Sequence, residues 1–153
     1  MDYDNDGDLD LAMTRENSTA VLLENRTNNS KFLLVRLVGS GAGGTNKAAI
    51  GIRMELWDAS GTTRLGRRDV GVARGYGGAE PLWAHFGGVD PSTTYTLKVW
   101  FHSRDNSNPL EVSVVPNSVS TTIGTTVIPQ MITIEESSPR KRILRWREVP
   151  NRG

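Results

Sequence analysis

The chain has 153 residues, a net charge of +1 and no cysteine. The lack of cysteine excludes disulfides, thiol nucleophiles and metal sites built on thiolates. The length suits one medium domain with or without attachments, and no apolar run reaches the roughly 20 residues of a membrane-spanning helix. The charge is uneven, because five aspartates fall in residues 1–10, whereas residues 137–153 hold six basic residues and one acidic residue. The two ends are therefore expected to have different partners.

The first ten residues contain an acidic loop with the pattern D-x-D-x-D-G-x-x-D. Calcium takes about six to eight oxygen ligands, and carboxylates at alternate positions of a tight loop converge on one point. Gly7 falls where the chain must turn sharply. Five aspartates in nine residues also repel one another unless a cation compensates their charge. By analogy with EF-hand spacing, we expect calcium to be bound by the side chains of Asp2, Asp4, Asp6 and Asp10 and by the main-chain oxygen of Asp8.

The loop differs from an EF-hand at its twelfth position, where Met13 replaces the bidentate glutamate. The nine-residue form is instead similar to the calcium loops of FG-GAP (VCBS) repeats, which lie in β-propeller blades. Two alternating segments, 9–14 and 19–24, predict two strands, which is half of a four-stranded blade. Residues 1–27 are therefore interpreted as a partial repeat with Ca²⁺ as its cofactor, at the end of a longer array. Magnesium and a solvated acidic turn are the alternatives.

Residues 28–136 show the pattern of many short strands. In residues 50–56 the apolar Ile52, Met54 and Leu56 alternate with Arg53 and Glu55, as in a strand with one buried face. Residues 95–101 alternate in the same way. Further strands are expected at 31–38, 62–73, 110–115, 122–128 and 131–135. Such a series predicts an all-β fold, an antiparallel β-sandwich, with a propeller-type calcium-loop repeat in front of it.

Two segments of this domain carry a family resemblance. Residues 33–39 read L-L-V-R-L-V-G, and residues 46–54 read N-K-A-A-I-G-I-R-M. They resemble the ASPIC/UnbV family, in which a valine- and leucine-rich strand leads into N-R-x-A-I-G-x-R-V. Residues 74–87 resemble that family's Gly-Tyr segment and His-Phe-Gly strand, although the turn after Trp100 departs from the family's Trp-Pro-x-Gly. The resemblance implies a sandwich preceded by calcium-binding repeats, as in cartilage acidic protein-like proteins.

No catalytic residue is assigned, and the chain is expected not to be an enzyme. His85 and His102 are the two histidines, and neither lies in a nucleophile motif or a zinc-binding pattern. His85 is expected to be a hydrogen-bonded structural residue at a strand end. The side chains of Trp57, Trp83 and Trp100 could form a platform for sugar, although aromatic residues in sandwiches mostly pack in cores.

The expected function is that of a non-enzymatic adhesion or recognition module in a larger secreted protein. A calcium site of modest affinity favours an extracellular or periplasmic location, where calcium is abundant. Its expected partner is calcium, with a protein or glycan ligand at the cell surface, and neither nucleic acid nor a membrane span. An enzyme or accessory protein of natural-product biosynthesis and a carbohydrate-binding module are the alternatives. The basic extension, residues 137–153, is expected to dock on its own domain.

Overall fold

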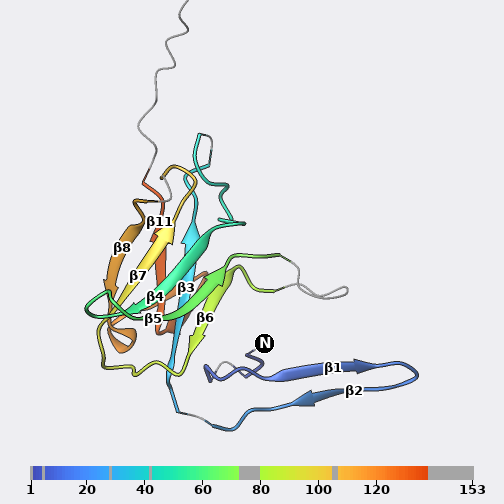
Figure 1. Cartoon of the computed structure of the whole chain (residues 1–153). Helices are drawn as coiled ribbons and strands as arrows, with labels where there is room; N and C mark the ends of the chain where they lie inside the picture. The colour runs from blue at the N-terminus through green and yellow to red at the C-terminus, as the bar shows by residue number, and fades with distance from the viewer. Residues whose placement is uncertain are drawn as a thin grey trace, which may run out of the picture.

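The computed structural model describes residues 2–4, 6–27, 29–41, 43–72, 80–104 and 107–137. Within these ranges the protein is almost entirely β-structure, with one short 3-10 helix, η1 (Pro116–Ser118). Figure 1 shows a β-sandwich from which an N-terminal hairpin extends. The all-β sandwich predicted from the sequence is therefore confirmed. No helix in the described ranges has the length and apolar character needed to cross a membrane.

The described strands form four sheets. A four-stranded sheet has the order β5-β4-β7-β8, a three-stranded sheet has the order β11-β3-β6, and two hairpins pair β1 with β2 and β9 with β10. In chain order the strands are β1 (Leu11–Arg15), β2 (Ser18–Leu23), β3 (Phe32–Val38), β4 (Arg53–Asp58), β5 (Arg64–Asp69), β6 (Trp83–Gly87), β7 (Tyr95–Trp100), β8 (Leu110–Val114), β9 (Ser120–Ile123), β10 (Thr126–Pro129) and β11 (Met131–Glu135).

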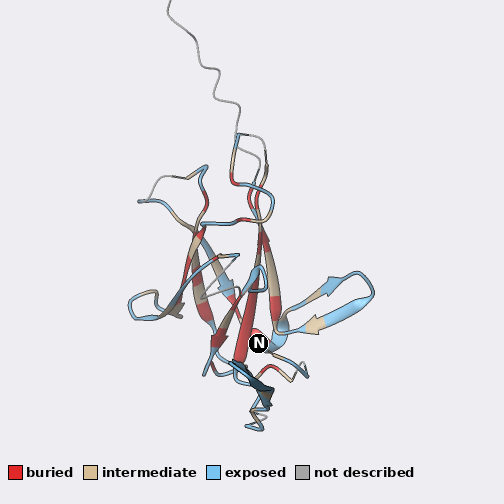
Figure 2. Cartoon of the chain, turned by 90° about the vertical axis from the view of Figure 1, so that its right-hand side faces the viewer, coloured by how far each residue is buried: buried red, intermediate tan, exposed pale blue. Residues whose placement is uncertain are grey.

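The main core lies between the two larger sheets. The alternation of apolar and polar residues in β4 and β7 places one side chain in two on this inner face. The residues expected there from the sequence are all buried, and Figure 2 shows buried residues throughout the sandwich and exposed residues along the β1–β2 hairpin. The confirmed inward-facing residues are Ile52, Met54, Leu56, Tyr95, Leu97, Val99 and Phe101.

Strand β3 is buried on both faces. Leu33, Val35 and Leu37 belong to the main core, as the alternation predicts. Phe32 and Leu34 point to the opposite face, where Met131 joins them in a second small cluster. A central strand covered on both sides reads as a continuous apolar run, which explains the sequence F-L-L-V. Phe32 thereby places an aromatic ring on the outside of the three-stranded sheet, next to the N-terminal loop.

The structure departs from the predicted strands at three places. The strand expected over residues 62–73 is shorter, because β5 covers only Arg64–Asp69, and residue 73 lies outside the described residues. Residues 122–128, expected to form one strand, are split between β9 and β10 by a turn at Gly124, whose φ of 62° favours glycine. Strand β4 begins at Arg53 and not near Ile50, because Ala49 and Gly51 have φ angles of 54° and 87° and form a turn.

One strand pair in the sandwich is parallel. Strand β11 runs parallel to β3, with Met131 opposite Leu34 and Glu135 opposite Val38, whereas all other described pairs are antiparallel. Parallel neighbours need a crossover connection, and here the intervening chain includes the whole four-stranded sheet. The Gly-Tyr part of the family-like segment 74–87, and all but Ser137 of the predicted basic extension 137–153, lie outside the described residues.

Candidate metal centre

The acidic loop brings three of the five predicted ligands together. One carboxylate oxygen from each of Asp2, Asp4 and Asp10 lies within 4.8 Å of the other two. Oxygens that bind one calcium ion at about 2.3–2.6 Å can be no more than about 5 Å apart. The three carboxylates are therefore spaced as ligands of a single ion of this size, and hard oxygen donors are the type that calcium prefers.

Hydrogen bonds inside the loop explain how the sequence produces this convergence. The amide of Gly7 donates to Oδ2 of Asp2 at 3.2 Å, and the amide of Asp6 donates to Oδ1 of Asp4 at 3.3 Å. The amide of Asp8 donates to Oδ1 of Asp6 at 2.8 Å. Short aspartate side chains that accept from amides further along the chain stabilise tight turns. Gly7 permits the turn because its φ is 92°.

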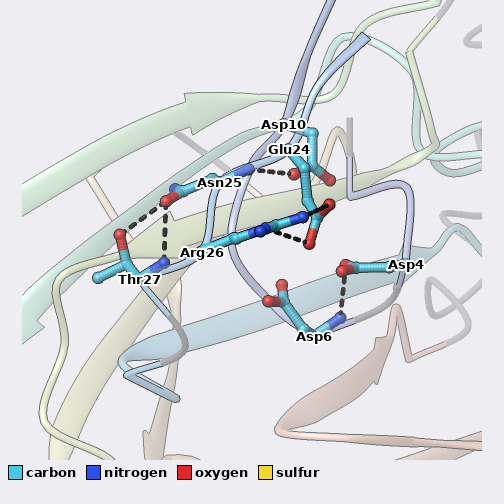
Figure 3. Close-up of polar contacts among 7 residues, drawn as sticks. All are labelled: Asp4, Asp6, Asp10, Glu24, Asn25, Arg26 and Thr27. Carbon is cyan, nitrogen blue, oxygen red and sulfur yellow. Dashed lines mark hydrogen bonds and ion pairs between the residues drawn. The ribbon is translucent and has the colours of Figure 1, made fainter.

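Asp10 ties the loop to the end of the hairpin. Its two carboxylate oxygens accept hydrogen bonds from the amides of Tyr3, at 2.7 Å, and Asn25, at 2.8 Å. These two backbone hydrogen bonds lower the pKa of Asp10, so its carboxylate stays charged. Asp10 is also buried, with 6% of its surface exposed. Figure 3 shows the Asp10–Asn25 hydrogen bond near Asp4 and Asp6.

The structure gives Asp6 and Asp8 different roles from the three grouped carboxylates. Oδ1 of Asp6 is engaged by the amide of Asp8, and the side chain of Asp6 is outside the group formed by Asp2, Asp4 and Asp10. The predicted side-chain ligand at Asp6 and the predicted main-chain ligand at Asp8 both remain predictions. Glu24, which the sequence did not single out, lies close enough for Asp10 to act on its pKa, although its pair with Arg26 lowers that pKa overall.

The loop rests on the sandwich through Gly7. A Cβ atom on Gly7 would overlap the ring of Phe32, so the glycine lies directly against that ring. The imidazole of His85 stacks on Phe32, with 6.0 Å between ring centroids and 11° between planes. Nε2 of His85 lies 2.8 Å from the carbonyl oxygen of Gly7. Because a carbonyl can only accept a hydrogen bond, Nε2 must carry the proton.

No sequence pattern predicts this contact. The hydrogen bond expected for His85 is confirmed, but its partner is 78 residues away in the chain. His102 uses its backbone amide, which donates to Oγ1 of Thr45 at 2.8 Å. No local pattern links Gly7, Phe32 and His85, so only the three-dimensional arrangement reveals them as one unit.

The three tryptophans considered as a sugar platform lie on two sheets. Trp57 and Trp100 belong to β4 and β7 of the four-stranded sheet, whereas Trp83 belongs to β6 of the other sheet. The ammonium of Lys98 lies 4.6 Å from the Trp57 ring centroid, and the guanidinium of Arg53 lies 3.9 Å from that of Trp100. These cations cover one face of each ring, which is a structural use of aromatic side chains.

Another buried carboxylate, Glu136, directly follows the last residue of β11. Its oxygens accept hydrogen bonds from the amide and hydroxyl of Ser40, at 2.8 and 2.6 Å, and from the amide and hydroxyl of Thr45, both at 2.9 Å. The amide of Ser103 adds a fifth, at 3.3 Å. Burial pushes the pKa of Glu136 upward, but these hydrogen bonds outweigh it and hold the pKa well below its usual range. Glu136 therefore fastens two loops to the end of the last strand.

Comparison with known proteins adds no assignment: no family model, curated protein or solved structure matches the chain.

Proposed function

We propose that residues 2–10 bind one calcium ion and that the protein is a calcium-stabilised, non-enzymatic recognition module of a secreted protein. The observation that carries the proposal is the convergence of Asp2, Asp4 and Asp10, whose oxygens lie within 4.8 Å of one another. The side chain of Asp6 and the main-chain oxygen of Asp8 complete the proposed ligand set. Water supplies the remaining ligands of an ion that takes about six to eight.

The chemistry of the loop favours calcium over magnesium. Magnesium loses its waters reluctantly and is usually held by only one or two carboxylates, whereas calcium accepts many protein oxygens in flexible geometry. The loop offers five aspartates in nine residues. An exposed site of this kind fills at the millimolar calcium found outside cells, which supports the extracellular or periplasmic location.

The proposed ion joins two parts of the molecule. Asp10 holds the amides of Tyr3 and Asn25, at the two ends of the segment that contains the β1–β2 hairpin. Gly7 rests on Phe32 and His85 of the sandwich. By neutralising the mutual repulsion of the carboxylates, calcium stabilises the loop conformation that makes both sets of contacts. A fixed arrangement of hairpin and sandwich suits recognition of a protein or glycan. Our proposal also includes membership of the ASPIC/UnbV family.

Calorimetric titration with calcium tests the site. The wild-type protein should bind one ion with a dissociation constant of about 0.1–1 mM, as extracellular modules do. Asp4→Asn, which removes one charge at an exposed position, should weaken binding by about tenfold. Asp69→Asn is the matched control, because Asp69 is an exposed aspartate paired with Arg67 on β5 and should leave calcium binding unchanged.

The outcome that would remove the proposal is clear. Absence of detectable heat and of any thermal stabilisation at 10 mM calcium, roughly ten times the weakest expected dissociation constant, would show that the loop is a solvated acidic turn. Equal binding by wild type and Asp4→Asn would place the ion elsewhere. Replacing calcium by magnesium in the same titration separates the two ions, since magnesium should bind at least about tenfold more weakly.

A further inference from the structure

Two adjoining hollows lie along the edge where β5 of one sheet meets β6 of the other. Figure 1 shows these two strands next to each other without pairing. The first hollow has a volume of about 270 Å³ and the second about 320 Å³, and both are lined by Arg68, Gly87 and Gly88. We refer to the two together as the β5–β6 cleft. Ligand sites are concave regions of this size, often at junctions between structural units.

Glycines form part of both walls of the cleft. A Cβ atom on Gly66 of β5 would lie 3.2 Å from Cδ1 of Phe86 on β6, so the Phe86 ring lies directly against the backbone of Gly66. Gly88 has a φ of 75° and no atoms within 4 Å of a Cβ position. At these two positions the chain adds no side chain to the cleft.

The two hollows differ in chemistry. The first is lined mainly by apolar side chains, among them Leu56, Leu65 and Phe86. The second adjoins the N-terminal loop and is lined by polar side chains that include Lys31 and His85, with Asp8 as its acidic member. Arg68 lies where they meet. The cleft therefore has an apolar end and a polar end in which basic groups outnumber acidic ones.

The guanidinium of Arg68 is held in place by two main-chain carbonyls and has no acidic partner among the described residues. Its Nε donates to the carbonyl of His85 at 3.0 Å and its Nη1 to the carbonyl of Arg67 at 2.8 Å. The guanidinium lies 5.3 Å from the ring centroid of Phe86. Arg64 and Arg67 of the same strand form ion pairs, with Glu55 and Asp69, whereas Arg68 forms none in the described part of the chain.

We propose that the β5–β6 cleft binds a small amphipathic carboxylate, with its carboxylate at Arg68 and Lys31 and its apolar group between Leu65 and Phe86. A guanidinium held in place by two carbonyls loses little freedom when it pairs with a carboxylate, whose planar geometry it matches. N-acylated or C-terminal apolar amino acids have this chemistry. The apolar end of the cleft lies in the sandwich, whereas the polar end adjoins the calcium loop through Asp8 and Leu9. The proposed ligand contacts involve no metal ion.

N-acetyl-L-leucine is a suitable probe, titrated into ¹⁵N-labelled protein in metal-free buffer. A ligand of this size should bind with a dissociation constant on the order of 1 mM. The amide signals of Gly87 and Gly88 should shift, whereas those of Gly61 and Gly124, in distant turns, should not. N-acetyl-L-leucinamide lacks the charge and N-acetylglycine lacks the apolar group, so each should bind at least about fivefold more weakly.

Two variants and one control test the residues that line the cleft. Arg68→Gln should weaken binding of N-acetyl-L-leucine by about tenfold, because a hydrogen bond to a charged group is lost. Arg67→Gln is the matched control: it is the neighbouring residue, points to the other face of β5, and should bind as the wild type does. Gly66→Ala narrows the apolar hollow against Phe86 and should also weaken binding. Unchanged glycine signals at 20 mM probe, roughly twentyfold above the expected dissociation constant, equal binding of the amide, or equal binding by Arg68→Gln would each overturn the proposal.

Discussion

His85 and Gly7 are 78 residues apart in the chain and joined by a hydrogen bond of 2.8 Å between Nε2 and the main-chain oxygen. Together with the Phe32 ring, this bond fastens the turn of the acidic loop to the sandwich. A ligand that binds only the folded loop stabilises whatever is fastened to it. Calcium is therefore expected to raise the stability of the sandwich as well as that of the hairpin.

His85→Leu should weaken this coupling. Loss of one hydrogen bond is worth about 0.5–1.5 kcal/mol, which corresponds to a fall in calcium affinity of roughly two- to twelvefold. His85→Gln can still donate to the carbonyl of Gly7 and should recover part of the affinity. Calorimetric titration of the three proteins measures the effect, with His102→Leu as the control because the hydrogen bond of His102 uses its backbone amide.

If His85→Leu binds calcium as tightly as the wild type does, then the loop assembles without help from the sandwich. If the wild-type protein itself binds no calcium, then the proposed metal site is wrong, which is a different result from a loss of coupling. The partial recovery by glutamine separates loss of the hydrogen bond from a general effect of substitution.

Removing a side chain from the main core should be costly. Leu97 of β7 is fully buried between the two sheets. Leu97→Ala should lower the free energy of unfolding by about 2–5 kcal/mol, because the deleted methyl groups leave a cavity in close-packed surroundings. Urea denaturation measures this value. Val127→Ala, at a position 62% exposed, should change it by less than about 0.5 kcal/mol. A similar small loss for Leu97→Ala would contradict the observed arrangement of β7.

Glu136 should make the stability of the sandwich sensitive to acid. The pKa of its carboxyl lies below the ordinary value of 4.5 in the folded state, because hydrogen bonds from Ser40, Thr45 and Ser103 outweigh the effect of burial. A carboxyl with a depressed folded pKa contributes stability above its unfolded pKa and loses that contribution as the pH falls. Stability should therefore decline below about pH 4.5 as the pH moves towards the folded pKa.

Glu136→Gln isolates this contribution. The neutral amide cannot accept five hydrogen bonds as a carboxylate does, and the unmatched buried donors should lower the free energy of unfolding at pH 7 by about 3 kcal/mol. The loss should shrink as the pH falls below 4.5, because the wild type then loses its own advantage. Urea denaturation at pH 7 and pH 3.5 gives the difference. Equal losses at both pH values would mean that the charge of Glu136 does not matter.

Local pattern was enough to predict most of the fold. Alternation placed the inward-facing residues of β4 and β7 correctly because each strand has one buried face. The same rule does not reveal β3's second buried face, since burial of Phe32 and Leu34 depends on what covers them. It also assigns Glu55 to the outer face without showing that this side chain is buried and accepts hydrogen bonds from Trp57 and Arg64.

Only the part of the candidate site formed by residues close together in the sequence could be predicted. The aspartate spacing predicts a metal loop because all the expected ligands lie within nine residues. The contacts of Gly7 with Phe32 and His85, and of Glu136 with Ser40 and Thr45, join distant segments and leave no short-range signal. The parallel pairing of β11 with β3 is equally non-local. The family resemblance and the calcium assignment both remain predictions.

Gly7→Ala should strongly reduce the calcium response while the sandwich stays folded. The φ of Gly7 is 92°, a conformation that costs a residue with a side chain about 1–3 kcal/mol. The added methyl group would also overlap the ring of Phe32, so the loop must leave its position on the sandwich. Once displaced, its carboxylates no longer converge, and calcium affinity should fall by at least about tenfold.

Gly124→Ala is the matched control for backbone strain. Gly124 also has a positive φ, 62°, but a Cβ atom there would meet nothing within 4 Å. This variant should lose about 1 kcal/mol of stability and keep the full calcium response. The two proteins are compared by thermal unfolding with and without 5 mM calcium. This concentration is roughly five times the weakest expected dissociation constant. If Gly7→Ala retains the wild-type rise in melting temperature, then close contact between Gly7 and Phe32 is not needed for calcium binding, and the loop acts independently of the sandwich.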